Sequence, residues 1–197
     1  MLSRQTVIEE SPPAAAAFDD DQHLVNRAKK DPAVFSELYE KHADRVYRYL
    51  LSRVGNVPDA QDLTSQTFLT ALENMHKFRG DGVFAAWLLS IARHKAMDHF
   101  RRQRPQGDME MAEYIASDDD DPDDVISRKL QTEMITRKLE TISPDRAEAI
   151  RLRLFGGLAA AEIAKAMDKN EPAVRMLIHR GLQDLQQQLN FTLEDVL

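Results

Sequence analysis

Basic residues crowd one end of an apolar segment that spans residues 84–102. The apolar side chains recur at helical spacing and predict one buried helix face; they are Phe84, Trp87, Leu88, Ile91 and Ala92. The second half of the segment is cationic, with Arg93, Lys95, Arg101 and Arg102. Ammonium and guanidinium groups gathered on a helix bind phosphate oxygens, so these residues predict the binding of nucleic acid.

A second basic segment, near the C-terminus, has the pattern of a helix-turn-helix. Residues 162–167 are periodic, a polar break follows, and residues 172–180 resume the pattern with Asn170 as the expected N-cap. The second helix of such a motif enters the major groove. Its expected outward residues are Glu171, Ala173, Arg175, Met176, His179 and Arg180, and its expected inward residues are Val174, Leu177 or Ile178, and Leu182. An ordinary pair of helices with a solvated basic face remains the alternative interpretation.

Residues that could carry out catalysis form no recognisable motif. The chain has no cysteine, which excludes disulfides, thiolate zinc sites and cysteine nucleophiles. His94 and His99 are five residues apart, a poor spacing for a helical metal pair, and no glycine-rich phosphate loop occurs. The acidic run at residues 118–121 lacks the glycine and glutamate that a calcium-binding loop needs. We therefore expect no enzyme activity, no metal and no cofactor.

The net charge of −7 hides an uneven distribution. Residues 106–124 hold nine acidic residues and no lysine or arginine, whereas residues 93–104 carry five basic residues against Asp98 alone. The acidic segment is poor in large apolar residues and repels itself, which predicts an extended, flexible linker. The negative total is therefore compatible with binding to DNA.

Helical periodicity on both sides of this linker predicts an all-α protein with two helical domains. We expect a mobile N-terminal tail at residues 1–21, a helical domain at 22–105, the acidic linker at 106–124 and a helix-turn-helix domain at 125–197. No apolar run approaches the roughly 20 residues of a membrane-spanning helix, and no secretion signal is recognisable. A cytoplasmic location is the expectation.

Local signals place several helix ends. Pro58 opens a helix whose expected inner face includes Leu63, Phe68 and Leu72. The preceding helix has Tyr39 among its periodic apolar residues. Ser143-Pro144 predicts the start of a helix that runs through Leu154.

The aromatic residues around the 84–102 segment have two possible roles. Trp87 lies on the apolar face and is expected in the core. Exposed aromatic rings can instead stack on unpaired bases while neighbouring cations hold the backbone. Phe78 and Arg79, in the loop beside the glycines at 80 and 82, are better placed for that role.

Taken together, the motifs resemble those of extracytoplasmic-function (ECF) sigma factors, which are bacterial RNA polymerase specificity subunits. The resemblance rests on DAQDLTSQTF at residues 59–68, FRG at 78–80, WLLSIAR at 87–93, GL at 157–158 and EIA at 162–164. It implies a sigma region 2-like helical bundle and a sigma region 4-like helix-turn-helix. It covers most of the chain outside the tail and the linker.

The resemblance also implies three sets of contact residues. A surface for the polymerase core, formed by its β and β′ subunits, would include Asp59, Asp62, Leu63, Gln66 and Phe68. The reader and melter of the −10 promoter element would include Lys77, Phe78, Arg79, Arg93, His94, Lys95, Asp98, Arg101 and Arg102. The −35 element would be read by Glu171, Ala173, Arg175, Met176, His179 and Arg180. An anti-sigma factor is a further implied partner.

Four positions depart from the family's pattern. Ala159 stands where a Ser or Thr helix cap is usual, Lys169 replaces an apolar turn residue, and Leu177 stands where a basic residue is common. His94 replaces a frequent asparagine. The departures at Ala159, Lys169 and Leu177 keep open a sigma-like decoy that sequesters an anti-sigma protein without reading DNA. A repressor that uses only the helix-turn-helix is a third function, but it would leave the N-terminal motif unexplained.

Overall fold

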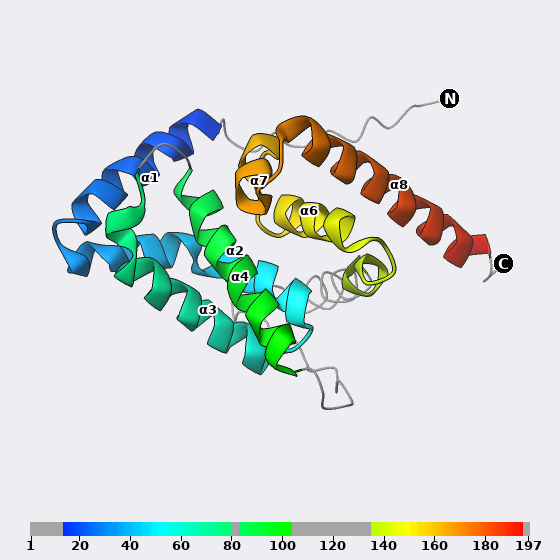
Figure 1. Ribbon diagram of the computed structural model, residues 1–197, viewed down its shortest axis with the longest axis horizontal. Coiled ribbons are helices and arrows are strands. Elements are labelled where there is room, and N and C mark those ends of the chain that lie inside the picture. The colour runs from blue at the N-terminus through cyan, green and yellow to red at the C-terminus, as the bar shows by residue number, and fades with distance from the viewer. Residues whose placement is uncertain (1–13, 80–82, 104–134, 195–197) are drawn as a thin grey trace, which may run out of the picture.

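The computed structural model describes residues 14–79, 83–103 and 135–194, and every regular element in these ranges is a helix. This confirms the all-α class. Figure 1 shows α1 to α4 grouped on one side of the molecule and α6 to α8 on the other. The expected acidic linker at 106–124 lies outside the described residues.

Four long helices form the first bundle. They are α1 (Ala14–Ala28), α2 (Phe35–Val54), α3 (Val57–Glu73) and α4 (Phe84–Gln103), with short 3-10 helices at Pro32–Val34 and Met75–Lys77. Gly55 ends α2 at a φ of 75°, a left-handed conformation that glycine adopts without steric cost. Asn56 then caps α3 by accepting a hydrogen bond from Asp59 N at 2.8 Å. Gly55 and Asn56 therefore determine where α2 ends and α3 begins.

The N-terminal tail expected at residues 1–21 overlaps α1, which begins at Ala14. Asp21 is buried and fastens α1 to α2, because its Oδ1 lies 2.9 Å from Lys41 Nζ and 3.2 Å from His42 Nε2. Burial alone raises the pKa of Asp21, but the hydrogen bonds and charges of His42 and Lys41 outweigh it and lower that pKa. Asp21 is thus part of the folded domain, in a helix that begins at Ala14.

The second bundle contains a helical segment at residues 135–139, α6 (Pro144–Leu154), α7 (Ala160–Met167) and α8 (Glu171–Glu194). The α6 bounds agree with the expectation from Ser143-Pro144 and Leu154. Asn170 accepts a hydrogen bond from Ala173 N at 2.8 Å, so its expected role as the cap of α8 is confirmed. A separate apolar cluster of Leu139, Ala147, Ile150 and Leu185 stabilises this bundle.

The two bundles share one apolar core. α4 packs against α7 and α2 contacts α6, and buried Leu88 and Leu89 belong to the same cluster as Leu158 and Ile163. The approach is close: a Cβ on Gly156 would lie 2.9 Å from Leu89 Cδ1. The bundles are therefore docked against each other. None of the described helices combines the length and the apolarity needed to cross a bilayer.

Candidate nucleic-acid interface

The polar residues of the 59–68 motif lie on α3 in two different environments. Asp62 is exposed and accepts a hydrogen bond from Gln66 Nε2 at 2.7 Å, one turn further along the helix. Asp59 is half-buried, accepts a hydrogen bond from Asn56 Nδ2 at 2.7 Å, and lies 3.2 Å from His99 Nε2 of α4. Asp62 is thus available to a partner, whereas Asp59 also holds α3 against α4.

Leu63 and Phe68 belong to the implied polymerase set but lie in the core of the first bundle. Their exposed fractions are 3% and 4%. Phe68 packs edge-on against Phe35 and Tyr39, with ring centroids 6.2 and 4.7 Å away. Both residues can therefore position α3, but a direct contact with a partner is not available to them in this fold.

Sequence reasoning missed an exposed apolar patch beside Asp62 and Gln66. Leu69 is 61% exposed, Leu72 is 38% exposed, and Tyr39 of the neighbouring α2 is 45% exposed. The expectation that Leu72 lies on the inner face is wrong. Leu69 follows Gln66 by three positions and Asp62 by seven, a spacing that places all three on one face of a helix. This helical spacing was the sequence signal that could have identified Leu69 as part of the exposed face.

The segment after α3 forms one wall of a pocket of about 300 Å³. Lys77, Phe78 and Arg79 line it together with Trp87 of α4, and Lys165 of α7 contributes from the second bundle. Phe78 is only 5% exposed and packs against Phe84 and Trp87, with centroids 5.6 and 5.3 Å away. The expectation of an exposed, stacking Phe78 therefore does not hold, whereas Arg79 is exposed as expected.

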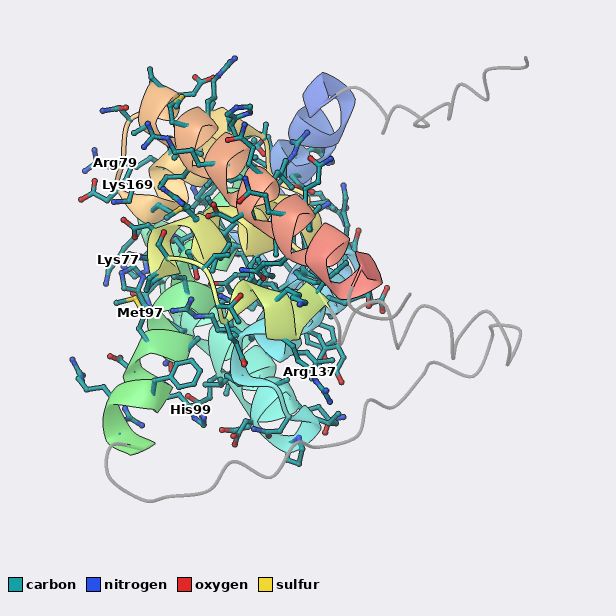
Figure 2. The ribbon with its side chains drawn as sticks, turned by 90° about the vertical axis from the view of Figure 1, so that its right-hand side faces the viewer. Lys77, Arg79, Met97, His99, Arg137 and Lys169 are labelled. Atoms are coloured by element: carbon teal, nitrogen blue, oxygen red, sulfur yellow. The ribbon has the colours of Figure 1, made fainter. Side chains whose placement is uncertain are left out.

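The cations of α4 differ in their surroundings. Arg101 and Arg102 are exposed near the helix end, and Arg101 Nη2 lies 3.1 Å from Asp98 Oδ1. Lys95 is half-buried, and exposed His94 places Nδ1 2.6 Å from Ser90 O. Figure 2 shows Lys77, Arg79, Met97 and Lys169 along one edge of the molecule. This edge offers cations from the first bundle to an anionic chain.

Arg93 is the exception among these cations. Only 20% of its side chain is exposed, and its Nε lies 3.6 Å from Glu148 Oε1 of α6 in the second bundle. It does not face open solvent with Arg101 and Arg102 in the docked arrangement.

The candidate −35 residues lie on the N-terminal half of α8. Arg175, Met176, His179 and Arg180 are exposed, and Glu171 and Ala173 are half-buried. The Arg175 guanidinium donates two hydrogen bonds to Glu171 Oε1, at 3.0 and 2.5 Å. This half of α8 therefore presents a mixed but accessible polar face.

The inward face of α8 agrees only partly with expectation. Val174 is fully buried, and Leu177 and Ile178 pack against the shared core. Leu182 is 47% exposed, so its expected inward position is wrong. Gly181 takes that place: a Cβ there would lie 2.6 Å from Ile150 Cδ1, so the α8 backbone itself meets α6.

Two of the departures from the family's pattern, Lys169 in the turn and Ala159 at the start of α7, make polar contacts in the fold. Asp168 adopts a left-handed φ of 54°, and Lys169 Nζ reaches Asp145 Oδ2 at 3.1 Å. Ala159 has no side-chain acceptor, but its N–H donates to Glu162 Oε2 at 2.7 Å. One half of a capping box thus remains at the start of α7.

The three implied sets of residues are not brought together. They occupy α3, the edge formed by α4 with its preceding loop, and α8. Such separated surfaces suit binding to extended macromolecules rather than chemistry at one point. Among the described residues, no group of acidic, histidine or cysteine side chains is arranged to hold a metal ion.

Comparison with known proteins places both bundles in one family. Residues 38–106 match the family model of Sigma-70 region 2, and residues 132–185 match that of Sigma-70 region 4. The chain is 36% identical over 166 residues to the ECF RNA polymerase sigma factor BldN of Streptomyces coelicolor, covering 82% of this chain and 63% of BldN. It is 30% identical over 161 residues to the RNA polymerase sigma factor CarQ of Myxococcus xanthus, covering 79% of this chain and 88% of CarQ.

A solved structure has the same fold. The sigma factor RpoE, in complex with the anti-sigma factor NepR from Bartonella quintana, aligns with a TM-score of 0.64 and 19% identity. The alignment covers 79% of this chain and 96% of that chain.

Proposed function

This chain belongs to the ECF sigma factor family, and we propose that it binds RNA polymerase core and selects promoters by reading DNA with its two helical bundles. The observation that supports this most strongly is the order of the two sigma regions in one chain, each with exposed arginines on a candidate DNA helix. These are Arg101 and Arg102 on α4, and Arg175 and Arg180 on α8.

The polymerase contact is assigned to the exposed face of α3. Asp62 and Gln66 supply its polar part, and Leu69 and Leu72 supply apolar area next to it. An apolar patch rimmed by polar groups is typical of a protein interface. Leu63, Phe68 and the contact between Asp59 and His99 would hold this face in position.

The −10 element is assigned to the α4 edge and the pocket before it. Lys77, Arg79, Arg93, Arg101 and Arg102 would hold the phosphate backbone, and half-buried Trp87 would line the pocket for an unstacked base. Stacking on an aromatic wall contributes about 1–3 kcal/mol per base. Promoters whose strands separate easily would therefore be favoured.

The −35 element is assigned to the exposed face of α8. Arg175 and His179 lie one turn apart and Arg180 follows His179 directly, an arrangement that fits the major groove of duplex DNA. Glu171 holds Arg175 in the free protein and would have to release it when DNA binds. Phosphate contacts on both helices would make the affinity fall steeply with salt.

Control by an anti-sigma factor completes the proposal, because a protein of the same fold has been solved with one bound. The chemistry of RNA synthesis would belong to the polymerase. A decoy that only sequesters an anti-sigma protein is the alternative function.

The proposal is tested by mixing polymerase core with this chain, capturing the complex, and sequencing the genomic DNA fragments that it retains. The expected result is a set of fragments that share two sequence elements at a fixed spacing. Core that binds the chain but retains no such fragments would support the decoy instead.

A further inference from the structure

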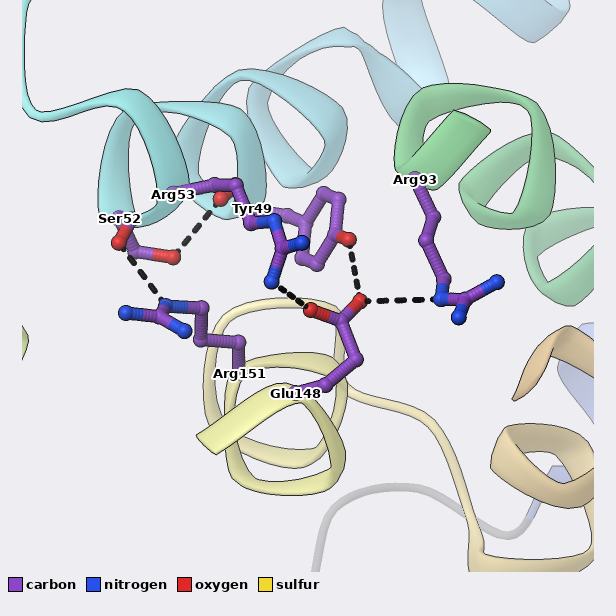
Figure 3. Close-up of polar contacts among 6 residues, drawn as sticks. All are labelled: Tyr49, Ser52, Arg53, Arg93, Glu148 and Arg151. Atoms are coloured by element: carbon purple, nitrogen blue, oxygen red, sulfur yellow. Dashed lines mark hydrogen bonds and ion pairs between the residues drawn. The ribbon is translucent and has the colours of Figure 1, made fainter. Parts of the chain in front are cut away.

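One buried carboxylate joins the two bundles. Glu148, on α6, is 3% exposed. It accepts a hydrogen bond from Tyr49 Oη of α2 at 2.6 Å and another from Arg53 Nη1 of the same helix. Its Oε1 also lies 3.6 Å from Arg93 Nε of α4. Figure 3 shows Glu148 reaching from its helix between these three side chains.

A second contact beside it crosses the same boundary. Arg151, one turn after Glu148 on α6, donates from Nε to the backbone oxygen of Ser52 at 3.0 Å. Burial, followed by the nearby charge of Arg53, lowers the pKa of Arg151, and burial followed by the charge of Glu148 raises the pKa of the Tyr49 hydroxyl. Tyr49 therefore stays a hydrogen-bond donor at neutral pH.

The charges of this cluster do not balance. Arg53, Arg93 and Arg151 contribute three positive charges. Glu148 pairs with Arg53 and Arg93, and the charges of Glu148 and Glu140 both act on Arg151, so the positive charges still outnumber the negative ones. If Glu148 loses its charge, three guanidinium groups remain close together at a buried boundary. Removing one partner of a buried ion pair is costly because the other partner stays desolvated. The docking of the bundles thus depends strongly on this carboxylate.

Arg93 connects the cluster to the candidate DNA surface. It belongs to the α4 set assigned to the −10 element, yet in the docked arrangement it lies against Glu148. Its Nε makes no hydrogen bond within the described part of the chain, so the contact of this nitrogen with Glu148 is an ion pair without a hydrogen bond. The pocket lined by Lys77 and Trp87 is likewise closed on one side by Lys165 and Ala166 of α7.

We infer that Glu148 is a latch: it holds the two bundles docked, with Arg93 and the Trp87 pocket engaged by the second bundle, and the chain binds −10 DNA fully only after the bundles separate. The assignment of Arg93 and the pocket to DNA rests on the proposed function. The docking of the two bundles does not rest on the proposed function. The docking and the DNA assignment can therefore be tested separately.

The docking is tested on the full chain without DNA or polymerase. Because the chain has no cysteine, cysteines at exposed Gln61 of α3 and exposed Gln183 of α8 accept spin labels at these two positions only. Pulsed electron paramagnetic resonance then measures the distance between the two spin labels, and hence between the bundles. We expect one narrow distribution in the parent chain, and a broad, longer one in Glu148→Lys, with helix content unchanged by circular dichroism.

A second substitution distinguishes the loss of the latch from a general folding defect. Adding Arg53→Glu to Glu148→Lys restores an opposite pair and should restore the narrow distribution. The milder Glu148→Gln should raise the ratio of separated to docked molecules on the order of 100-fold. A broad distribution in the parent chain, or a narrow one in Glu148→Lys, would overturn the latch.

The second part of the inference is that docking of the bundles inhibits DNA binding. It is tested by the affinity for a 20-nucleotide single-stranded DNA of random sequence, measured by fluorescence anisotropy. Glu37→Lys is the matched control, because it makes the same charge change at an exposed site in the first bundle. We expect Glu148→Lys to bind at least about tenfold more tightly than Glu37→Lys, and the Arg53→Glu rescue to lose that gain. Equal affinities alongside separated bundles would overturn the inhibitory role. No DNA binding by any variant would overturn the DNA assignment, while the distance measurement would still decide the docking.

Discussion

Asp59 of α3 and His99 of α4 are in polar contact, with 3.2 Å between Oδ2 and Nε2. The pair links the helix assigned to the polymerase with the helix assigned to the −10 element. Both side chains are partly shielded from solvent, so the contact should contribute more than a fully exposed pair does.

Replacing Asp59 with Asn should lower the free energy of unfolding by about 1 kcal/mol, because the contact with His99 and a hydrogen bond from Asn56 to the carboxylate are weakened. Urea denaturation measures the effect. Asp62→Asn is the matched control, because exposed Asp62 contacts Gln66 on its own helix. An equal loss of stability in both variants would show that the Asp59–His99 pair has no special part in the packing of α3 on α4.

Leu63 and Leu69 should give opposite results although both are leucines on α3. Leu63→Ala removes a buried side chain and should reduce stability by about 2–5 kcal/mol. Leu69→Ala should leave stability within about 0.5 kcal/mol but weaken binding to polymerase core, measured by sedimentation. Normal core binding by Leu69→Ala would remove Leu69 from the proposed interface.

Replacing Arg101 and Arg102 together with Ala should leave core binding and stability unchanged, because both side chains are exposed. Promoter opening should become weaker and its salt dependence shallower, since phosphate contacts are lost. Permanganate reactivity of unpaired thymines reports the opening. Unchanged opening at every salt concentration would contradict the role assigned to these arginines.

The attachment of α1 should depend on pH through Asp21. Because the pKa of Asp21 is lowered in the folded chain, its carboxylate stabilises the fold above the unfolded pKa near 3.8 and loses this effect as the pH falls further. The stability difference between the parent chain and Asp21→Asn should therefore be largest near neutral pH and shrink below about pH 4. A difference that stays constant down to pH 3 would contradict this account.

Ala159→Ser should stabilise the second bundle by about 1 kcal/mol. Ala159 has extended backbone angles, φ −73° and ψ 161°, and a serine there can accept a hydrogen bond at the start of α7. Thermal unfolding of the full chain measures the gain. Ala161→Ser, an exposed position inside the same helix, is the control and should bring no gain.

Local signals predicted the starts of α6 and α8. Asn170 and Pro144 act within one helical turn, so the sequence alone places the starts of α8 and α6. Periodicity also predicted that Val174 is buried. It did not fix how far around each helix the buried face extends: Leu72 and Leu182 follow the apolar pattern but are 38% and 47% exposed.

Contacts between the bundles left no local signal. Glu148 is one acidic residue in a charged helix, and its partners Tyr49 and Arg93 are 99 and 55 positions away along the chain. Motif spacing likewise could not separate Asp62 from Leu63, because a motif records which residues recur and not which face each occupies. Only the structure shows that Asp62 is exposed and Leu63 is buried.

The most direct test of the proposed function is transcription in vitro from a genomic promoter library, with purified polymerase core and this chain, followed by sequencing of the RNA 5′ ends. We predict new start sites that share two upstream elements and that disappear when the chain is omitted. Tight binding to core without any new start site would contradict the assignment of this chain as a promoter-selecting subunit.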